Sequence, residues 1–285
     1  MNMIGIHAGV WGGDWTKQAA RYAIESTAEI GYDFIEIPAV NPRQVDVPHT
    51  VRLLDYTGLG AVVSVALDGE RDITADDPDV SARGEALLNS AVTFAQEIGA
   101  DYVGGVTYSA MIKYTHPATV ESRERSLVVL RRVAGRAKSL GIRLGIEYVN
   151  RYESNLLNTA AQTVEFIADL DADNVMLHLD TYHANSEETS LIAAVRDAGP
   201  LLGYIHASES HRGLLGTGVL DFPGLFRELA SSGYSGPITF ESFSSTVLPR
   251  STSNMIGLWR EPWIDPQMAA REAHAFLHAQ LRAAA

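Results

Sequence analysis

The chain has 285 residues, of which 46% are hydrophobic and 20% charged, as expected for a soluble globular protein with a sizeable core. Its formal net charge is −13, and its three lysines (Lys17, Lys113 and Lys138) are scattered, so it lacks the basic stripe that a nucleic-acid partner requires. Such an acidic chain suits a neutral small molecule, or a site that holds a cation.

The sequence contains no cysteine, which rules out disulfides and thiol chemistry and suits the cytosol. The first residues carry neither the basic nor the apolar segment of a signal peptide. No uninterrupted apolar run approaches the roughly 18 residues that a membrane span needs. We therefore expect a cytoplasmic protein with no membrane partner.

Eight short apolar runs alternate with longer amphipathic segments along the whole chain. They predict strands at residues 4–10, 34–37, 61–66, 102–106, 143–148, 175–179, 203–207 and 237–240. The segments between them have apolar residues at three- and four-residue spacing, which predicts helices. Four of the strands follow a glycine that would end the preceding helix: Gly31, Gly99, Gly141 and Gly233.

Eight β-α units in about 250 residues are what a (β/α)₈ barrel requires, and strict alternation implies parallel strands. A doubly wound sheet is the competing fold, but no Gly-x-Gly-x-x-Gly follows the first strand. The sequence therefore predicts a (β/α)₈ TIM barrel, α/β in class, as a single domain over residues 1–285. Residues 258–285 would form a C-terminal helical extension, whose aromatic residues could pack on the barrel or on a second subunit.

The last four predicted strands each end in a side chain that can bind a metal. These residues are Glu147, Asp180, His206 and Glu241. Because the carboxyl ends of barrel strands meet at one rim, we expect three carboxylates and one imidazole to converge there. Three like charges packed together repel one another, and a divalent cation removes that conflict. Oxygen ligands with a single histidine and no thiolate favour Mn²⁺, Mg²⁺ or Co²⁺ over a structural Zn²⁺.

Taken singly, each of these residues has a structural explanation. Asp180 would cap the helix that follows it, and His206 would be a hydrogen-bonded core histidine. Four such coincidences on consecutive strands favour a metal site instead. His178 shares the strand face of Asp180 one layer deeper, and we interpret it as a core residue. His7, at the end of the first strand, either lines the pocket or packs beside it.

Loops after barrel strands normally carry substrate contacts, and here they contain Glu153, His183 and Arg212. Three glycines within residues 213–218 could also cradle a phosphate, which barrels often bind near strands seven and eight. With Arg212 and His211 as the nearby cations, a phosphate is the weaker interpretation.

Together these motifs resemble the D-tagatose 3-epimerase family, which includes D-allulose (D-psicose) and L-ribulose 3-epimerases, within the xylose-isomerase-like TIM barrels. The resemblance covers essentially the whole chain. Its most specific parts are residues 147–153 (EYVNRYE), 179–188 (LDTYHANSEE) and 203–218. Residues 240–245 (FESFSS) and 258–260 (LWR) are most similar to the L-ribulose/D-allulose branch.

The resemblance implies that one divalent cation, Mn²⁺ in the first place and Co²⁺ or Mg²⁺ otherwise, is held by Glu147, Asp180, His206 and Glu241. Glu147 and Glu241 would double as the catalytic acid/base pair. The O1–O2 end of a ketose would be bound by Glu153, His183 and Arg212. His7 is a further candidate for substrate binding. The resemblance also implies a homodimer or homotetramer.

The expected activity is metal-dependent inversion of C3 in a free ketohexose or ketopentose of the D-allulose/D-fructose, D-tagatose or L-ribulose type. One glutamate would remove the C3 proton to give a cis-enediolate, and the other would return a proton to the opposite face. An aldose–ketose isomerase on the same metal is the first alternative. A metal-dependent phosphodiesterase would need more histidine ligands and a basic groove. A sugar-binding protein without activity would not require both glutamates.

Overall fold

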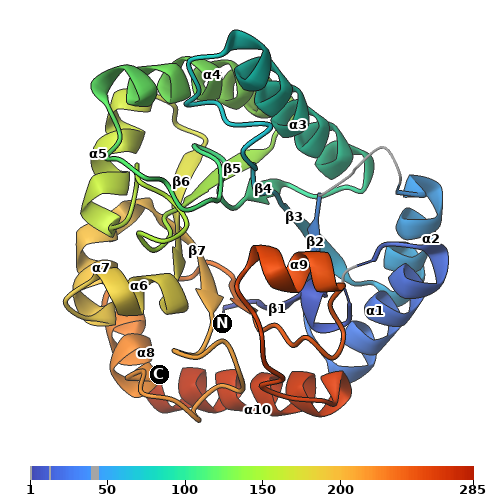
Figure 1. The fold of residues 1–285 in the computed structure, drawn as a ribbon. Helices are drawn as coiled ribbons and strands as arrows, with labels where there is room; N and C mark the ends of the chain where they lie inside the picture. The colour runs from blue at the N-terminus through green and yellow to red at the C-terminus, as the bar shows by residue number, and fades with distance from the viewer. Residues whose placement is uncertain (1, 13, 40–44) are drawn as a thin grey trace.

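The computed structural model describes residues 2–12, 14–39 and 45–285. Eight parallel strands pair in chain order, and the last pairs with the first to close a barrel (Figure 1). They are β1 (Ile4–His7), β2 (Phe34–Pro38), β3 (Gly60–Ser64), β4 (Tyr102–Gly104), β5 (Arg143–Glu147), β6 (Val175–Asp180), β7 (Leu202–Ala207) and β8 (Ile238–Phe240). The predicted (β/α)₈ barrel is therefore confirmed.

The first strand is shorter than the predicted segment 4–10. Ala8–Val10 forms a 3₁₀ turn, η1, because the Nδ1 atom of His7 accepts a hydrogen bond from the backbone N–H of Gly9 at 3.0 Å. The side chain of His7 therefore ends the strand at the barrel rim.

Helices surround the barrel, most of them as an outer layer, while the short helix at Arg250–Met255 lies inside that ring in the view of Figure 1. They are α1 (Lys17–Ile30), α2 (Val47–Thr57), α3 (Pro78–Glu97), α4 (Val120–Ser139), α5 (Ala160–Leu170), α6 (Thr181–Glu187), α7 (Leu191–Ala198), α8 (Phe222–Ser231), α9 (Arg250–Met255) and α10 (Pro266–Ala284), with a second 3₁₀ turn, η3 (Gly199–Leu201). The four predicted helix-ending glycines all have positive φ, between 72° and 99°. That left-handed conformation is favourable for glycine and lets the chain turn back towards the next strand.

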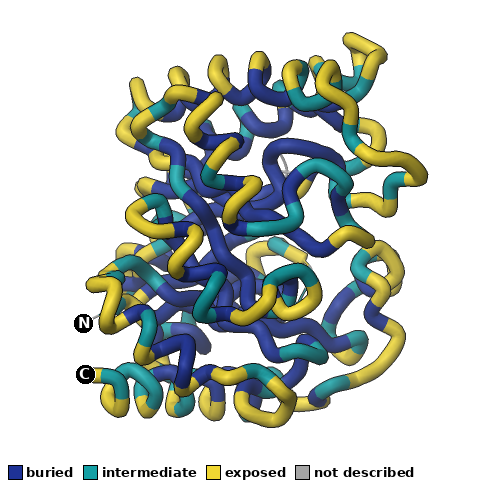
Figure 2. Tube along the Cα trace, turned by 90° about the vertical axis from the view of Figure 1, so that its left-hand side faces the viewer, coloured by how far each residue is buried: buried dark blue, intermediate teal, exposed yellow. Residues whose placement is uncertain are grey.

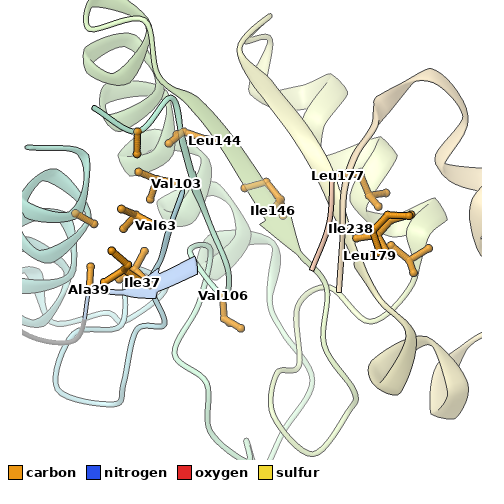
Figure 3. Packing of buried hydrophobic residues seen from close by; sticks show 14 of the residues in the cluster. Ile37, Ala39, Val63, Val103, Val106, Leu144, Ile146, Leu177, Leu179 and Ile238 are labelled. Carbon is orange, nitrogen blue, oxygen red and sulfur yellow. The ribbon is translucent and has the colours of Figure 1, made fainter. Parts of the chain in front are cut away.

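Alternation along each strand divides the apolar side chains into two clusters. One cluster lies between strands and helices and includes Ile146, Leu177 and Ile238 (Figure 3). The other is small and fills the barrel interior with rings, among them Tyr102 and Tyr204, which stack at 4.5 Å between ring centroids. The exposed residues lie mainly on the outer side of the helices (Figure 2).

The segment 258–285 contains α10, which packs against α8 and α1 in the outer layer (Figure 1). Trp263 in this segment is buried and donates a hydrogen bond from Nε1 to Ser242 Oγ, just after β8, at 2.8 Å. Trp259, by contrast, is 82% exposed. Within the described part of the chain, no helix is both long enough and apolar enough to cross a membrane.

Candidate active site

The ends of β5, β6, β7 and β8 bring four ionisable side chains into one buried cluster. Glu147 is the last residue of β5 and Asp180 the last of β6, His206 is the penultimate residue of β7, and Glu241 follows β8 directly. Strand alternation places each of them on the same face as the residue two positions earlier, which faces the barrel interior. All four predicted metal-binding residues thus lie together, at 0–7% exposure.

The distances in this cluster suit ligands that share one ion. His206 Nδ1 lies 3.7 Å from Glu147 Oε1 and 3.4 Å from Glu241 Oε1. Asp180, His206 and Glu241 offer ligand atoms that lie within 4.8 Å of one another. In the described structure, His206 Nδ1 and Asp180 Oδ2 are buried without a hydrogen-bond partner. Buried polar atoms are nearly always paired, so these two fit the ligand atoms of a cation site.

The charges lead to the same conclusion. Burial raises the pKa of the Asp180 carboxyl to about 7, and the charge of Glu241 adds to the rise. Burial also raises the pKa values of Glu147 and Glu241, although the neighbouring His206 opposes the change. A raised pKa means that the ionised form of a carboxyl is less favourable here than in water, and a nearby positive charge opposes that effect. A divalent cation supplies that charge, and three carboxylates with one imidazole form a suitable set of donors.

Asp180 caps a helix with one carboxyl oxygen and presents the other to the cluster. Its Oδ1 accepts a hydrogen bond from the backbone N–H of Tyr182 at 2.7 Å, so it caps α6. Its Oδ2 has no hydrogen-bond partner among the described residues and lies 3.7 Å from His183 Nε2. Capping therefore holds one oxygen in place and leaves the other free for the cluster.

The three predicted contacts to the substrate lie beside this cluster. His183 is in α6, and its Nε2 lies 2.9 Å from Arg212 Nη2 and 3.9 Å from Glu153 Oε2. Arg212, in the loop after β7, has a φ of 57°, and its guanidinium lies over the ring of Tyr182 at 4.2 Å. Burial lowers the pKa of His183 well below its usual value, and the charge of Arg212 lowers it further. A neutral imidazole and a fixed guanidinium can both bind sugar hydroxyls.

The two other histidines of the strands lie close by. His178, interpreted from the sequence as a core residue, is completely buried, with its ring centroid 4.1 Å from that of His206 and its Nδ1 3.9 Å from Glu147 Oε2. His7 both lines the cavity and packs edge-on against Phe243 at 5.4 Å. Burial lowers the pKa of His7 to about 4, so its ring is neutral at pH 7.

One residue of the site was missed by the sequence analysis. Glu36, in the middle of β2, is completely buried, and its Oε2 accepts hydrogen bonds from His206 Nε2 at 2.8 Å and Tyr204 Oη at 2.6 Å. The available signal was a glutamate inside the apolar run Phe34–Pro38. Charged residues are almost never fully buried unless they are paired.

The cluster forms one wall of a cavity of about 240 Å³, which suits a small molecule. We call this the polar wall, made of Glu147, His183, His206, Arg212 and Glu241. Another part of the lining is hydrophobic, and we call it the apolar wall; it is made of Val65, Leu67, Val106, Met111, Leu248 and Ile256. Thr252 and Met255 of the short helix α9 also line the cavity.

Known proteins are similar to this chain over nearly its whole length. Residues 24–280 match the family described as the xylose isomerase-like TIM barrel. A ketose 3-epimerase of Arthrobacter globiformis is 42% identical over 98% of this chain and 97% of its own length. The chain belongs to the ketose 3-epimerase family. An L-ribulose 3-epimerase of Methylomonas sp. (strain DH-1) is 43% identical over 96% of both chains.

Solved structures of this family have the same fold. D-allulose 3-epimerase from Methylomonas sp. in complex with D-allulose matches with a TM-score of 0.96 and 42% identity, over 98% of this chain and 97% of that one. The family resemblance predicted from the sequence motifs is therefore confirmed. The protein is an isomerase of the carbohydrate 3-epimerase class. The roles of its individual residues remain predictions.

Proposed function

We propose that this protein is a metal-dependent 3-epimerase of free ketohexoses or ketopentoses of the D-allulose/D-fructose, D-tagatose or L-ribulose type. The observation that carries the proposal is the position of Glu147 and Glu241. They come from β5 and β8, on either side of the strands that carry Asp180 and His206, and both approach His206 Nδ1 to within 3.7 Å. This arrangement supports two acids that reach one carbon from different sides.

In this proposal Glu147, Asp180, His206 and Glu241 hold one divalent cation, with Mn²⁺ in the first place and Co²⁺ or Mg²⁺ as alternatives. The buried, unpartnered atoms of Asp180 and His206 and the raised pKa values of the carboxyls support it. When bound, the cation polarises the C2 carbonyl of the ketose and stabilises the negative charge that develops as the C3 proton leaves.

The protein's own side chains move the proton. One glutamate takes it from C3, which gives a cis-enediolate, and the other returns a proton to the opposite face. A general acid or base is most efficient when its pKa lies near the working pH. Without metal, burial raises the pKa values of Glu147 and Glu241, and a bound cation would oppose that rise. Ligation to the cation would also hold both carboxylates in position.

Glu153, His183 and Arg212 would bind the O1–O2 end of the sugar. Their mutual contacts fix the donors and acceptors before the substrate arrives, which lowers the cost of orienting it. His7 would complete the pocket, since it lines the same cavity with a neutral ring. We also propose that the enzyme acts in the cytoplasm as a homodimer or homotetramer, which gel filtration with light scattering would test.

The direct test is a panel of ketoses incubated with the metal-loaded enzyme and with enzyme treated with EDTA. D-fructose, D-allulose, D-tagatose and L-ribulose cover the proposed range. We expect each accepted sugar to be converted into its C3 epimer, and EDTA to stop the conversion. Formation of aldoses instead of C3 epimers would contradict the proposal and would indicate an aldose–ketose isomerase on the same site.

A further inference from the structure

Glu36 lies on β2, away from the strands that supply the proposed metal ligands, yet its carboxylate contacts one of them. Its Oε2 accepts hydrogen bonds from His206 Nε2 at 2.8 Å and from Tyr204 Oη at 2.6 Å. The hydroxyl of Tyr204 lies in turn 2.5 Å from Thr239 Oγ1. The carboxylate is therefore held in the barrel interior by two residues of β7, one of which also contacts β8.

This contact determines which nitrogen of His206 is free. A neutral imidazole carries one N–H, and its other nitrogen has a lone pair. With the N–H on Nε2 donated to Glu36, the lone pair is on Nδ1. That atom is 3.7 Å from Glu147 Oε1 and 3.4 Å from Glu241 Oε1, and within the described residues it has no hydrogen-bond partner. The free nitrogen is thus the one that faces the carboxylates.

We propose that Glu36 is a positioning residue for the metal: it holds His206 in the tautomer and ring orientation in which Nδ1 binds the cation. A carboxylate on the far nitrogen also makes an imidazole a more basic ligand. The inference rests on the metal site of the proposed function and adds to it a residue that is neither one of the four proposed ligands nor one of the proposed sugar contacts.

A purely structural role for Glu36 has different consequences. The Oε1 atom of Glu36 has no hydrogen-bond partner in the described structure and lies 4.0 Å from His7 Nε2, so the pairing with His206 is the main charged contact of the carboxylate. A structural ion pair would stabilise the fold with or without metal. A positioning residue changes the affinity for the metal itself, which can be measured without any sugar.

The experiment compares Mn²⁺ binding by isothermal titration calorimetry in the full chain after metal removal. The variants are Glu36→Gln, which keeps the shape but removes the charge, and Glu36→Asp, which keeps the charge but withdraws it by one methylene. Thr239→Val is the matched control, because it removes a hydroxyl from the same interior network and leaves both hydrogen bonds to Glu36 in place.

We expect Glu36→Gln to raise the Kd for Mn²⁺ by about 10–100-fold, the usual effect of removing the partner of a metal-binding histidine. Glu36→Asp should raise the Kd as well. If the Gln variant does not fold, the Kd of the Asp variant tests the positioning role. Thr239→Val should leave the Kd within about threefold of wild type. Circular dichroism and thermal melts of the metal-free proteins check the fold.

Three results would overturn the inference: wild-type Kd in folded Glu36 variants, an equal rise in Kd for Thr239→Val, or no Mn²⁺ binding by the wild type. Failure of the proposed function is a separate outcome. A wild type that binds Mn²⁺ with these ratios but epimerises no ketose would refute the function and leave the role of Glu36 intact. A wild type that epimerises ketoses, with Glu36 variants that bind Mn²⁺ at the wild-type Kd, would support the proposed function and refute the role of Glu36.

Discussion

The two walls of the cavity differ in chemistry and come largely, although not entirely, from different strands of the barrel. The polar wall follows β5 to β8, and each of these strands has a carboxylate or an imidazole at its carboxyl end or one residue from it. The apolar wall follows β3 and β4, with Val65 directly after β3 and Val106 two residues after the end of β4, and is completed by residues around α9. Ionisable groups can move protons and bind a cation, whereas apolar groups select a ligand by shape. We infer that the polar wall sets the reaction and the apolar wall selects the sugar.

If the polar wall works only with its cation, metal removal should have the largest effect. We expect EDTA to abolish epimerisation and added Mn²⁺ to restore it. Because the cation would bind only the folded state, a concentration 100 times its Kd should stabilise the protein by about 2.7 kcal/mol. The melting temperature should rise with Mn²⁺ in the wild type but not in Asp180→Ala. Full activity after exhaustive chelation would contradict a metal-dependent polar wall.

Substitution of either glutamate of the polar wall should cause the second-largest loss of activity. We expect Glu147→Gln or Glu241→Gln to lower kcat/KM by about 10⁴-fold, since loss of a general acid or base costs about 10²–10⁴ and each residue also serves as a ligand. Steady-state kinetics at saturating Mn²⁺ measure the loss, and circular dichroism shows whether the fold persists. An active Glu241→Gln variant would refute the scheme with two acids.

Substitution of a proposed sugar contact in the polar wall should have a smaller effect, which changes kcat/KM for the sugar but not the binding of the metal. Arg212→Lys keeps the charge but loses the planar group that lies over Tyr182 and beside His183. Hydrogen bonds to charged groups contribute about 1.5–3 kcal/mol, so kcat/KM should fall by about 10–100-fold. The Kd for Mn²⁺ should stay within about threefold of wild type. A loss of metal binding in this variant would place Arg212 in the metal site instead.

The apolar wall should give the smallest effect and the most selective one. Met111→Ala shortens a side chain of this wall, which enlarges the cavity and leaves every ionisable group unchanged. One methylene in an apolar pocket changes discrimination by about 1–3 kcal/mol. We therefore expect the ratio of kcat/KM for ketohexoses over ketopentoses to rise by about tenfold. An equal loss for all sugars would show that this wall does not select by length.

Much of this arrangement could be predicted, because two regularities are visible in the sequence. Apolar runs mark the strands, and parallel closure brings their ends together, so Glu147 and Glu241 could be placed at the same rim although they are 94 positions apart (241 minus 147). The end of β1 was misplaced, because the turn there depends on a hydrogen bond from Gly9 to the ring of His7 rather than on apolar periodicity.

Glu36 could not be placed in the same way. It lies in the middle of a strand, 170 residues from His206, and its pairing depends on which interior side chains meet across the closed barrel. The sugar preference cannot be predicted from the sequence pattern either. It depends on the shape of the apolar wall, which loops after β3, β4 and β8 build together.

The most direct test of the central claim is the position of solvent deuterium in the product. Metal-loaded enzyme is incubated with D-fructose in D₂O, and the recovered sugars are analysed by NMR. If Glu147 and Glu241 exchange a proton at C3, the epimer formed carries deuterium at C3 and none at C1. Deuterium at C1 with unlabelled C3 would contradict the account, because it would show that the site moves a proton between C1 and C2.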